Sequence, residues 1–107
     1  MRRQGLRRVG VRALEQAAAI DPRSARAQNG LGVVAMKTGA KEAAFAHWKR
    51  AVELAPNDFD ALFNLGMELD AAGRREEARP FLDRFVREAP PAQYAPDITR
   101  VKRMLGR

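Results

Sequence analysis

Residues 25–58 read ARAQNGLGVVAMKTGAKEAAFAHWKRAVELAPND, and residues 59–92 read FDALFNLGMELDAAGRREEARPFLDRFVREAPPA. The second stretch repeats the pattern of the first at a constant offset, which aligns Gly32 with Gly66 and Gly39 with Gly73. A fixed period of this length is typical of proteins built from stacked copies of one structural unit. The sequence therefore predicts a repeat architecture.

Each copy has the pattern of two helices joined by a turn. Apolar residues recur every three or four positions, which is the period of a helix with one buried face. Gly39 and Gly73 end the first helix of each copy, because glycine tolerates the left-handed conformation that follows a helix. Pro56 and Pro90 follow the second helix, which proline cannot continue. We expect an all-α fold with helices near residues 2–20, 25–37, 41–54, 59–71, 75–88 and 93–105.

Three residues would weaken these helices if each helix stood alone. Gly32 and Gly66 each cost about 1 kcal/mol relative to alanine in a helix interior. Their recurrence indicates that a partner helix approaches closely where the side chain is missing. Pro80 falls inside the helix expected over residues 75–88. We expect it to bend that helix without ending it, because the apolar spacing continues.

Composition and charge limit the possible classes of protein. The chain has 107 residues and no cysteine, so it fits one domain and can form neither disulfides nor thiolate metal sites. No apolar run approaches the roughly 20 residues that a membrane span requires. The net charge of +7 is concentrated at the two ends: residues 1–24 carry six arginines against Glu15 and Asp21, whereas residues 59–92 carry five basic and seven acidic residues.

The aligned residues resemble the tetratricopeptide repeat, a helix–turn–helix unit with the same period. In the first copy the matching positions are Gln28, Leu31, Gly32, Ala35, Gly39, Ala44, Trp48, Ala51 and Pro56. In the second copy they are Leu62, Leu65, Gly66, Leu69, Gly73, Ala78, Leu82, Phe85 and Pro90. The resemblance implies a short right-handed solenoid in one domain. Its parts would be a half repeat at residues 2–22, full repeats at 25–58 and 59–92, and a capping helix at 93–107.

The resemblance also implies a protein or peptide partner, because repeats of this family bind such partners in a concave groove formed by the first helix of each repeat. Transferred position by position, the groove would be lined by Arg26, Asn29, Val33, Met36, Lys37, Asp60, Phe63, Asn64, Met67 and Asp70. Some members grip a terminal carboxylate with Asn and Lys at positions where this chain has Val33 and Asp60, which argues against that mode of binding. The apolar floor of this groove would be formed by Val33, Met36, Phe63 and Met67. One alternative stays open, namely that neighbouring helices or the capping helix cover part of this floor.

No arrangement of residues requires catalysis, and we predict neither an enzyme nor a cofactor or metal site. His47 is the only histidine and is expected at the surface, on the second helix of its pair. Trp48 is expected to pack between helices. The acidic residues Glu76, Glu77 and Asp83 are expected to form a solvated face with arginines at helical spacing.

Two other interpretations stay open. The tail, Arg84 to Leu105, also resembles the end of repeat segments fused to bacterial sulfatase-like enzymes, which would make the chain an accessory tail, periplasmic if the enzyme is exported and cytoplasmic otherwise. The arginines of residues 1–24 suit a nucleic-acid binder, but no aromatic residue lies among them to stack on bases.

The half repeat leaves apolar residues around Leu6, Val9 and Leu14 without a partner helix, which indicates self-association or an upstream domain.

Overall fold

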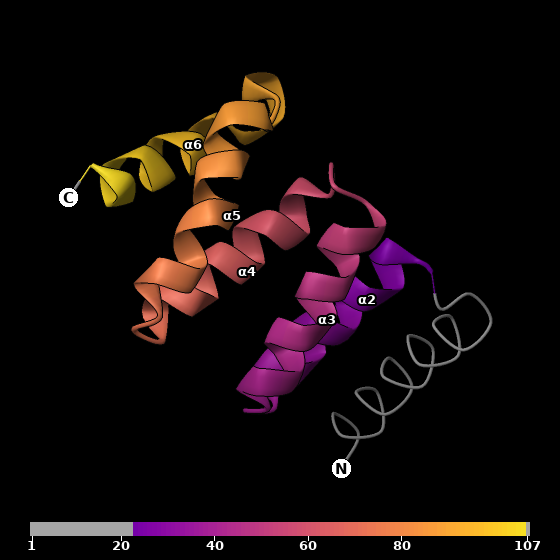
Figure 1. Ribbon diagram of the computed structural model, residues 1–107. Helices are drawn as coiled ribbons and strands as arrows, with labels where there is room; N and C mark the ends of the chain where they lie inside the picture. The colour runs from indigo at the N-terminus through magenta and orange to yellow at the C-terminus, as the bar shows by residue number, and fades with distance from the viewer. Residues whose placement is uncertain (1–22, 107) are drawn as a thin grey trace, which may run out of the picture. The chain divides into compact units, whose positions relative to one another are not determined.

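The computed structural model describes residues 23–106, and within this range the chain is helical without strands (Figure 1). The helices are α2 (Ala25–Lys37), α3 (Lys41–Leu54), α4 (Phe59–Ala71), α5 (Arg75–Glu88) and α6 (Pro91–Leu105). The all-α prediction is confirmed, and the bounds of the first four helices agree with it. The helix expected over residues 2–20 lies outside the described residues. Among residues 23–106, no helix has the length and apolar character that crossing a membrane requires.

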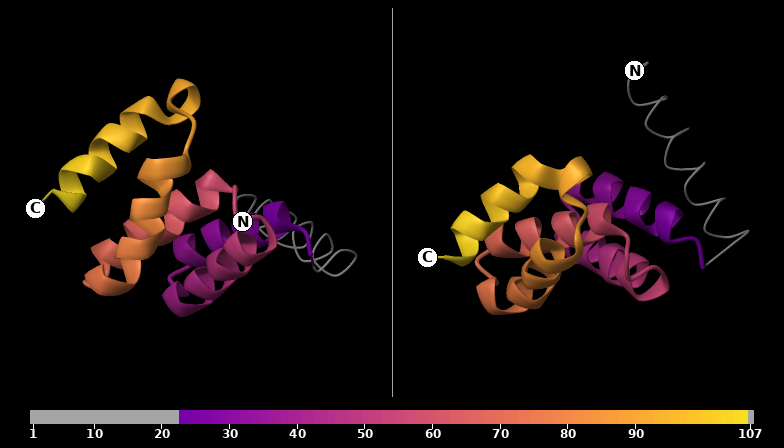
Figure 2. Two further views of the ribbon diagram at one scale, coloured as in Figure 1. Left: turned by 45° about the horizontal axis from the view of Figure 1, so that its top comes forward. Right: turned by 90° about the horizontal axis from the view of Figure 1, so that it is seen from above.

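The helices fall into two compact units, which divide after Pro56. In the described part of the first unit, α2 and α3 pack against each other as a helical hairpin. In the second unit, α4 and α5 form a hairpin of the same design, and α6 packs on α5 (Figure 2). Each unit therefore contains one helical pair with its own apolar core.

Side chains cap the first helix of each pair. The Ser24 hydroxyl oxygen accepts a hydrogen bond of 3.2 Å from the backbone N–H of Ala27, at the start of α2. The Asp58 carboxylate accepts one of 3.1 Å from the N–H of Ala61, at the start of α4. Both caps satisfy an N–H group that has no partner within its helix.

Glycine ends the same two helices, as the sequence predicts. The φ angle is 86° at Gly39 and 81° at Gly73. Both values lie in the left-handed region that residues with a side chain rarely adopt. After α2 the N–H of Ala40 reaches back to the carbonyl of Ala35 at 2.8 Å, and the corresponding bond after Gly73 is 2.9 Å long. This is the Schellman arrangement, which satisfies the last carbonyls of a helix and turns the chain into the next one.

The core of the first unit is built around Trp48, which is 2% exposed. Its ring lies directly over Gly32, so that a Cβ atom at Gly32 would stand 2.6 Å from Cδ1 and 2.8 Å from Cε2 of the indole. The indole N–H donates to the backbone carbonyl of Asn29 at 3.2 Å. The structure thus confirms that Trp48 packs between helices and that Gly32 allows the close approach.

The core of the second unit repeats this arrangement with a leucine. A Cβ atom at Gly66 would stand 2.7 Å from Cγ of Leu82. Helix α5 runs through Pro80 without ending, as expected, and the bend at this residue stays a prediction. The buried side chains of this unit are Ala61, Leu62, Leu65, Leu69, Ala78, Leu82, Phe85, Ala89, Ile98 and Val101.

Helix α6 differs from its prediction, because it begins at Pro91 and not at 93, and it is kinked. Pro91 occupies the first position of the helix, where a residue without an N–H group is tolerated. Tyr94 has φ −121° and ψ 18°, outside the helical range, two residues before Pro96. The ring of Pro96 removes one hydrogen bond of the helix and crowds the preceding turn. This accounts for the kink at Tyr94, beyond which the helix continues to Leu105.

The contact at Gly66 can be tested with a double-mutant cycle. The methyl group that Gly66→Ala adds would collide with the Leu82 side chain, so we expect a loss of about 1–3 kcal/mol in the free energy of unfolding. In a Leu82→Ala background the same change should be neutral or stabilise by up to about 1 kcal/mol, the difference in helix propensity. Urea denaturation followed by circular dichroism measures both. An equal loss in the two backgrounds would contradict the collision.

Candidate functional site

The residues predicted to line the groove from α2 share one face of that helix. Arg26 and Lys37 are exposed, whereas Asn29, Val33 and Met36 are half-buried. Their spacing of three or four residues makes them neighbours on the helix surface. This face of α2 therefore combines two apolar side chains with two basic ones at its ends.

The residues predicted from α4 also share a face. Asp60 is exposed, and Phe63, Asn64, Met67 and Asp70 are half-buried. Like the five residues of α2, none of them belongs to the buried core. Whether the two faces together form one groove stays a prediction.

Helix α6 covers part of the α4 face through one tyrosine. The hydroxyl of Tyr94 donates to the Asp60 carboxylate at 2.9 Å. The Tyr94 ring meets Phe59 at 6.0 Å and Phe85 at 5.5 Å, both nearly edge to face, and Phe63 in turn lies 5.2 Å from Phe85. Such ring pairs stabilise a contact beyond the area that they bury. The alternative left open by the sequence concerns the apolar residues of this face, and the contact at Asp60 does not decide it.

Carboxylates gather around this tyrosine. The pKa of Tyr94 is raised to about 12 by burial, by its hydrogen bond to Asp60, and by the negative charges of Asp60, Asp58 and Asp97. The pKa of Asp58 is also raised, mainly by burial and further by the charge of Asp60, against the opposing effect of the hydrogen bond from Ala61. The beginning of α4 and the beginning of α6 thus form an acidic, aromatic region.

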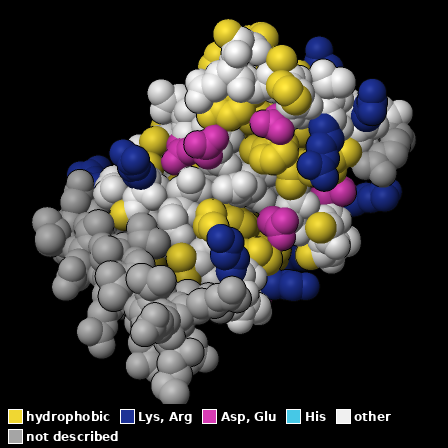
Figure 3. All heavy atoms as spheres, turned by 180° about the vertical axis from the view of Figure 1, so that it is seen from behind, with side chains coloured by type: hydrophobic (Ala, Val, Ile, Leu, Met, Phe, Trp, Pro, Cys, Tyr) yellow, Lys and Arg dark blue, Asp and Glu magenta, His cyan; other side chains and the backbone are white. Residues whose placement is uncertain are grey.

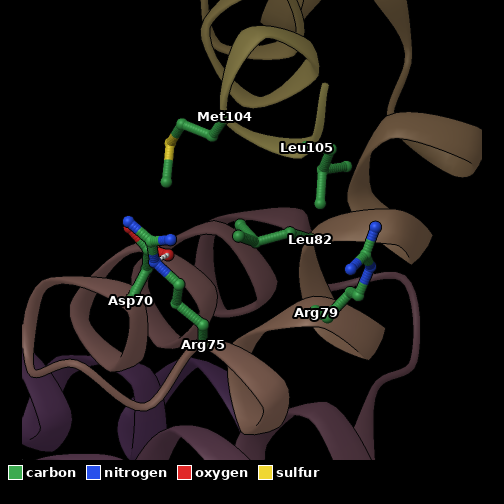
Figure 4. Close-up of a pocket in the computed structure, with 6 residues that line it drawn as sticks. All are labelled: Asp70, Arg75, Arg79, Leu82, Met104 and Leu105. Atoms are coloured by element: carbon green, nitrogen blue, oxygen red, sulfur yellow. Dashed lines mark ion pairs between the residues drawn. The ribbon is translucent and has the colours of Figure 1, made fainter. Parts of the chain in front are cut away.

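A pocket of about 110 Å³ lies at the other end of the second unit. Figure 4 shows Met104 and Leu105 of α6 facing Leu82 of α5, with arginine side chains on either side. A carboxylate oxygen of Asp70 stands 3.8 Å from Nε of Arg75. The residues that line the pocket are Asp70, Arg75, Arg79, Leu82, Met104 and Leu105.

The sequence did not indicate this pocket, and only Asp70 belongs to the predicted groove residues. The apolar residues near the end of α6 were a possible signal, but their facing partner on α5 depends on how the helices pack. The contact of Tyr94, by contrast, has a signal in the sequence. Tyr94 stands 34 residues after Asp60, at the same position of the repeat. That spacing could have indicated the contact between them.

Charges of both signs are scattered over the surface of the described residues. On the face drawn in Figure 3, hydrophobic side chains are exposed between acidic and basic ones. A surface of this kind suits contacts with proteins better than the uniform charge that follows a nucleic-acid backbone.

Comparison with known families agrees with this geometry. One model of the tetratricopeptide repeat matches residues 2–59, more than half of the chain, and a second model of the same repeat matches residues 47–79. The chain belongs to the tetratricopeptide repeat family. A search of curated proteins found no match. Tetratricopeptide repeats generally mediate protein–protein interactions, typically without catalysis of their own.

The single histidine of this tetratricopeptide repeat protein has a structural partner. His47 Nδ1 lies 2.9 Å from the side-chain oxygen of Gln28, and the histidine is half-buried between α2 and α3. The histidine is thus less exposed than the surface position expected for it, because Gln28 takes the place of a bulky residue and offers a polar partner. Within residues 23–106, no three His, Asp or Glu side chains are grouped to hold a metal ion.

The raised pKa of Tyr94 can be measured directly, because the chain has one tyrosine. We expect the phenolate absorbance to appear with a pKa of about 12 in the folded protein, against an ordinary value of 10.0. Asp60→Asn should lower this pKa but leave it above the ordinary value, because the burial of the ring remains. Asp83→Asn, on the exposed face of α5, is the control and should change little.

The same shift predicts how stability depends on pH. The folded state holds the phenolic proton more tightly than the unfolded state does. The contribution of Tyr94 to stability is therefore complete below pH 10 and is lost as the pH rises toward 12, as linkage between proton binding and folding requires. A wild-type titration near the ordinary value would show that neither the burial of Tyr94 nor its hydrogen bond to Asp60 persists in solution.

Proposed function

We propose that this chain is a protein-interaction module that binds an extended peptide or a helix of a partner along α2 and α4, the first helices of its two repeats. The observation that supports this function is the placement of Val33 and Met36 on α2, and of Phe63 and Met67 on α4. All four are apolar and none is buried in the core of its unit. Family membership supports the same class of function.

The chemistry of these faces suits an amphipathic partner. Burial of apolar surface contributes roughly 25 cal/mol per Å², so a few partner side chains on the methionines and on Phe63 supply most of the binding free energy. Methionine adapts its shape to different side chains because it is unbranched and polarisable. The polar residues at the edges, Arg26 and Asn64 among them, would set the orientation of the partner through hydrogen bonds and charge.

The contact between Tyr94 and Asp60 limits where the partner binds on α4. Because the Asp60 carboxylate already accepts a hydrogen bond, a partner would gain less from it than from the apolar residues further along the helix. We therefore place the main contact on α4 at Phe63 and Met67.

Replacement of these two residues tests the proposed surface. Peptides are first selected on the wild-type chain from a display library, and their dissociation constants are measured by fluorescence anisotropy. We expect the double variant Phe63→Asp and Met67→Asp to weaken binding roughly tenfold or more, since central apolar contacts dominate such interfaces. The double variant Ala43→Asp and Ala46→Asp adds the same charge at exposed positions of α3 and should bind as the wild type does.

A second variant separates loss of binding from loss of the fold. Phe63 contacts the buried ring of Phe85, so its replacement could also destabilise the second unit. Met67→Asp alone leaves the aromatic contacts in place, and circular dichroism checks that it stays helical. If this variant and the double variant both bind the selected peptides as tightly as the wild type, the partner does not use this face of α4.

A further inference from the structure

The pocket at the end of α6 combines an apolar centre with a cationic rim. Leu82 forms its floor from α5, and Met104 and Leu105 face it from α6 (Figure 4). These three side chains come from two different helices, so the pocket is a product of their packing. We propose that this pocket binds the carboxyl terminus of a partner polypeptide that ends in an aliphatic residue. The site goes beyond the function proposed for the faces of α2 and α4.

The size of the pocket selects the side chain. Its volume is about 110 Å³. An apolar cavity somewhat larger than this, of about 150 Å³, accepts benzene. One branched aliphatic side chain therefore fits this volume. Because Met104 and Leu105 are only half-buried, an aliphatic group that enters removes their apolar surface from water together with its own.

The charge at the rim selects an anion. Arg75 and Arg79 lie on opposite sides of Leu82. Asp70 forms an ion pair with Arg75, whereas Arg79 has no ion-pair partner among residues 23–106. Two guanidinium groups against one carboxylate leave a net positive charge beside the apolar centre. A guanidinium group can donate two parallel hydrogen bonds to one carboxylate, which therefore fits the rim.

The short distance between Arg79 and Leu82 favours a chain terminus as the ligand. Arg79 and Leu82 both belong to α5 and are neighbours on its surface. Side chains at this spacing have Cβ atoms roughly one helical turn apart, so the ligand must present an aliphatic group and a carboxylate close together. A C-terminal residue carries both on one Cα atom. In an extended internal segment, by contrast, the side chain of the next residue points to the opposite face and would carry its carboxylate away from the rim.

The methionines of this chain supply the readout. The chain has four methionines, of which Met104 lines the pocket and Met36 and Met67 lie on the proposed partner-binding faces. Labelling of the methionine methyl groups with carbon-13 gives a separate nuclear magnetic resonance signal for each. The probe is an N-acetylated tetrapeptide that ends in leucine with a free carboxylate, titrated into the full chain up to the millimolar range.

We expect the Met104 signal to shift and saturate with this peptide. The same peptide with a C-terminal amide should bind about fivefold more weakly, the order expected for one exposed charge pair. A peptide that ends in free alanine should also bind more weakly, because it leaves the apolar centre empty. Arg79→Gln should reduce binding of the carboxylate peptide to that of the amide, whereas Arg87→Gln, at an exposed position of the same helix outside the pocket, should leave it unchanged.

Three results would overturn the proposal: no shift of Met104, equal binding of carboxylate and amide, or an unchanged affinity in Arg79→Gln. The test is independent of the function proposed above. That function predicts shifts of Met36 and Met67 with the peptides selected on the wild-type chain, and Arg79→Gln leaves those shifts in place. If only the proposal for the pocket is wrong, the Met104 signal does not shift while those of Met36 and Met67 do. If only the proposal for the partner-binding faces is wrong, the Met36 and Met67 signals do not shift while that of Met104 does.

Discussion

Each helical pair depends on a missing side chain. Where α2 crosses α3, the Trp48 ring fills the space that a Cβ atom of residue 32 would need, and Leu82 fills the equivalent space at residue 66. Glycine costs about 1 kcal/mol within a helix. A buried aromatic side chain removes roughly 150–250 Å² from water, or about 4–6 kcal/mol at about 25 cal/mol per Å². The packing gain at Trp48 thus exceeds the local cost, and the contact sets how the two helices of the first pair lie against each other.

The same contrast between local and long-range effects explains how much of the fold could be predicted. The bounds of α2 to α5 follow from residues that act within one turn of chain, such as the caps Ser24 and Asp58 and the glycines that adopt a positive φ. Helix α6 was harder, because Pro91 and Pro96 act in different ways although both lie near its start. Pro91 initiates the helix, whereas Pro96 bends the turn that precedes it. The apolar spacing of the segment does not distinguish these two effects.

The candidate site, like the fold, could be predicted only where it depends on spacing within one helix. Helical spacing alone places Val33 and Met36 on one face of α2, and Phe63 and Met67 on one face of α4, outside the core. Helical spacing within one helix does not reveal that Tyr94 occupies the Asp60 carboxylate, for which the repeat spacing of 34 residues is the only signal in the sequence. Nor does it reveal the pocket, which exists only where α5 and the end of α6 meet.

The charges that stabilise α4 also give the second unit an electrical polarity, and this has a consequence for the direction of a bound peptide. Asp58 and Asp60 stand at the beginning of α4, where the helix dipole favours negative charge, and Arg75 follows its end and pairs with Asp70, where the dipole favours positive charge. A peptide parallel to α4 therefore meets carboxylates at one end of the helix and the arginines of the pocket at the other. Under the function proposed above, basic residues of the peptide are favoured near Tyr94 and acidic ones near Arg75. The reverse direction would bring like charges together at both ends, which disfavours it. In the proposed function, the electrostatic pattern that stabilises one helix would thus add to the polar edge residues in orienting the partner.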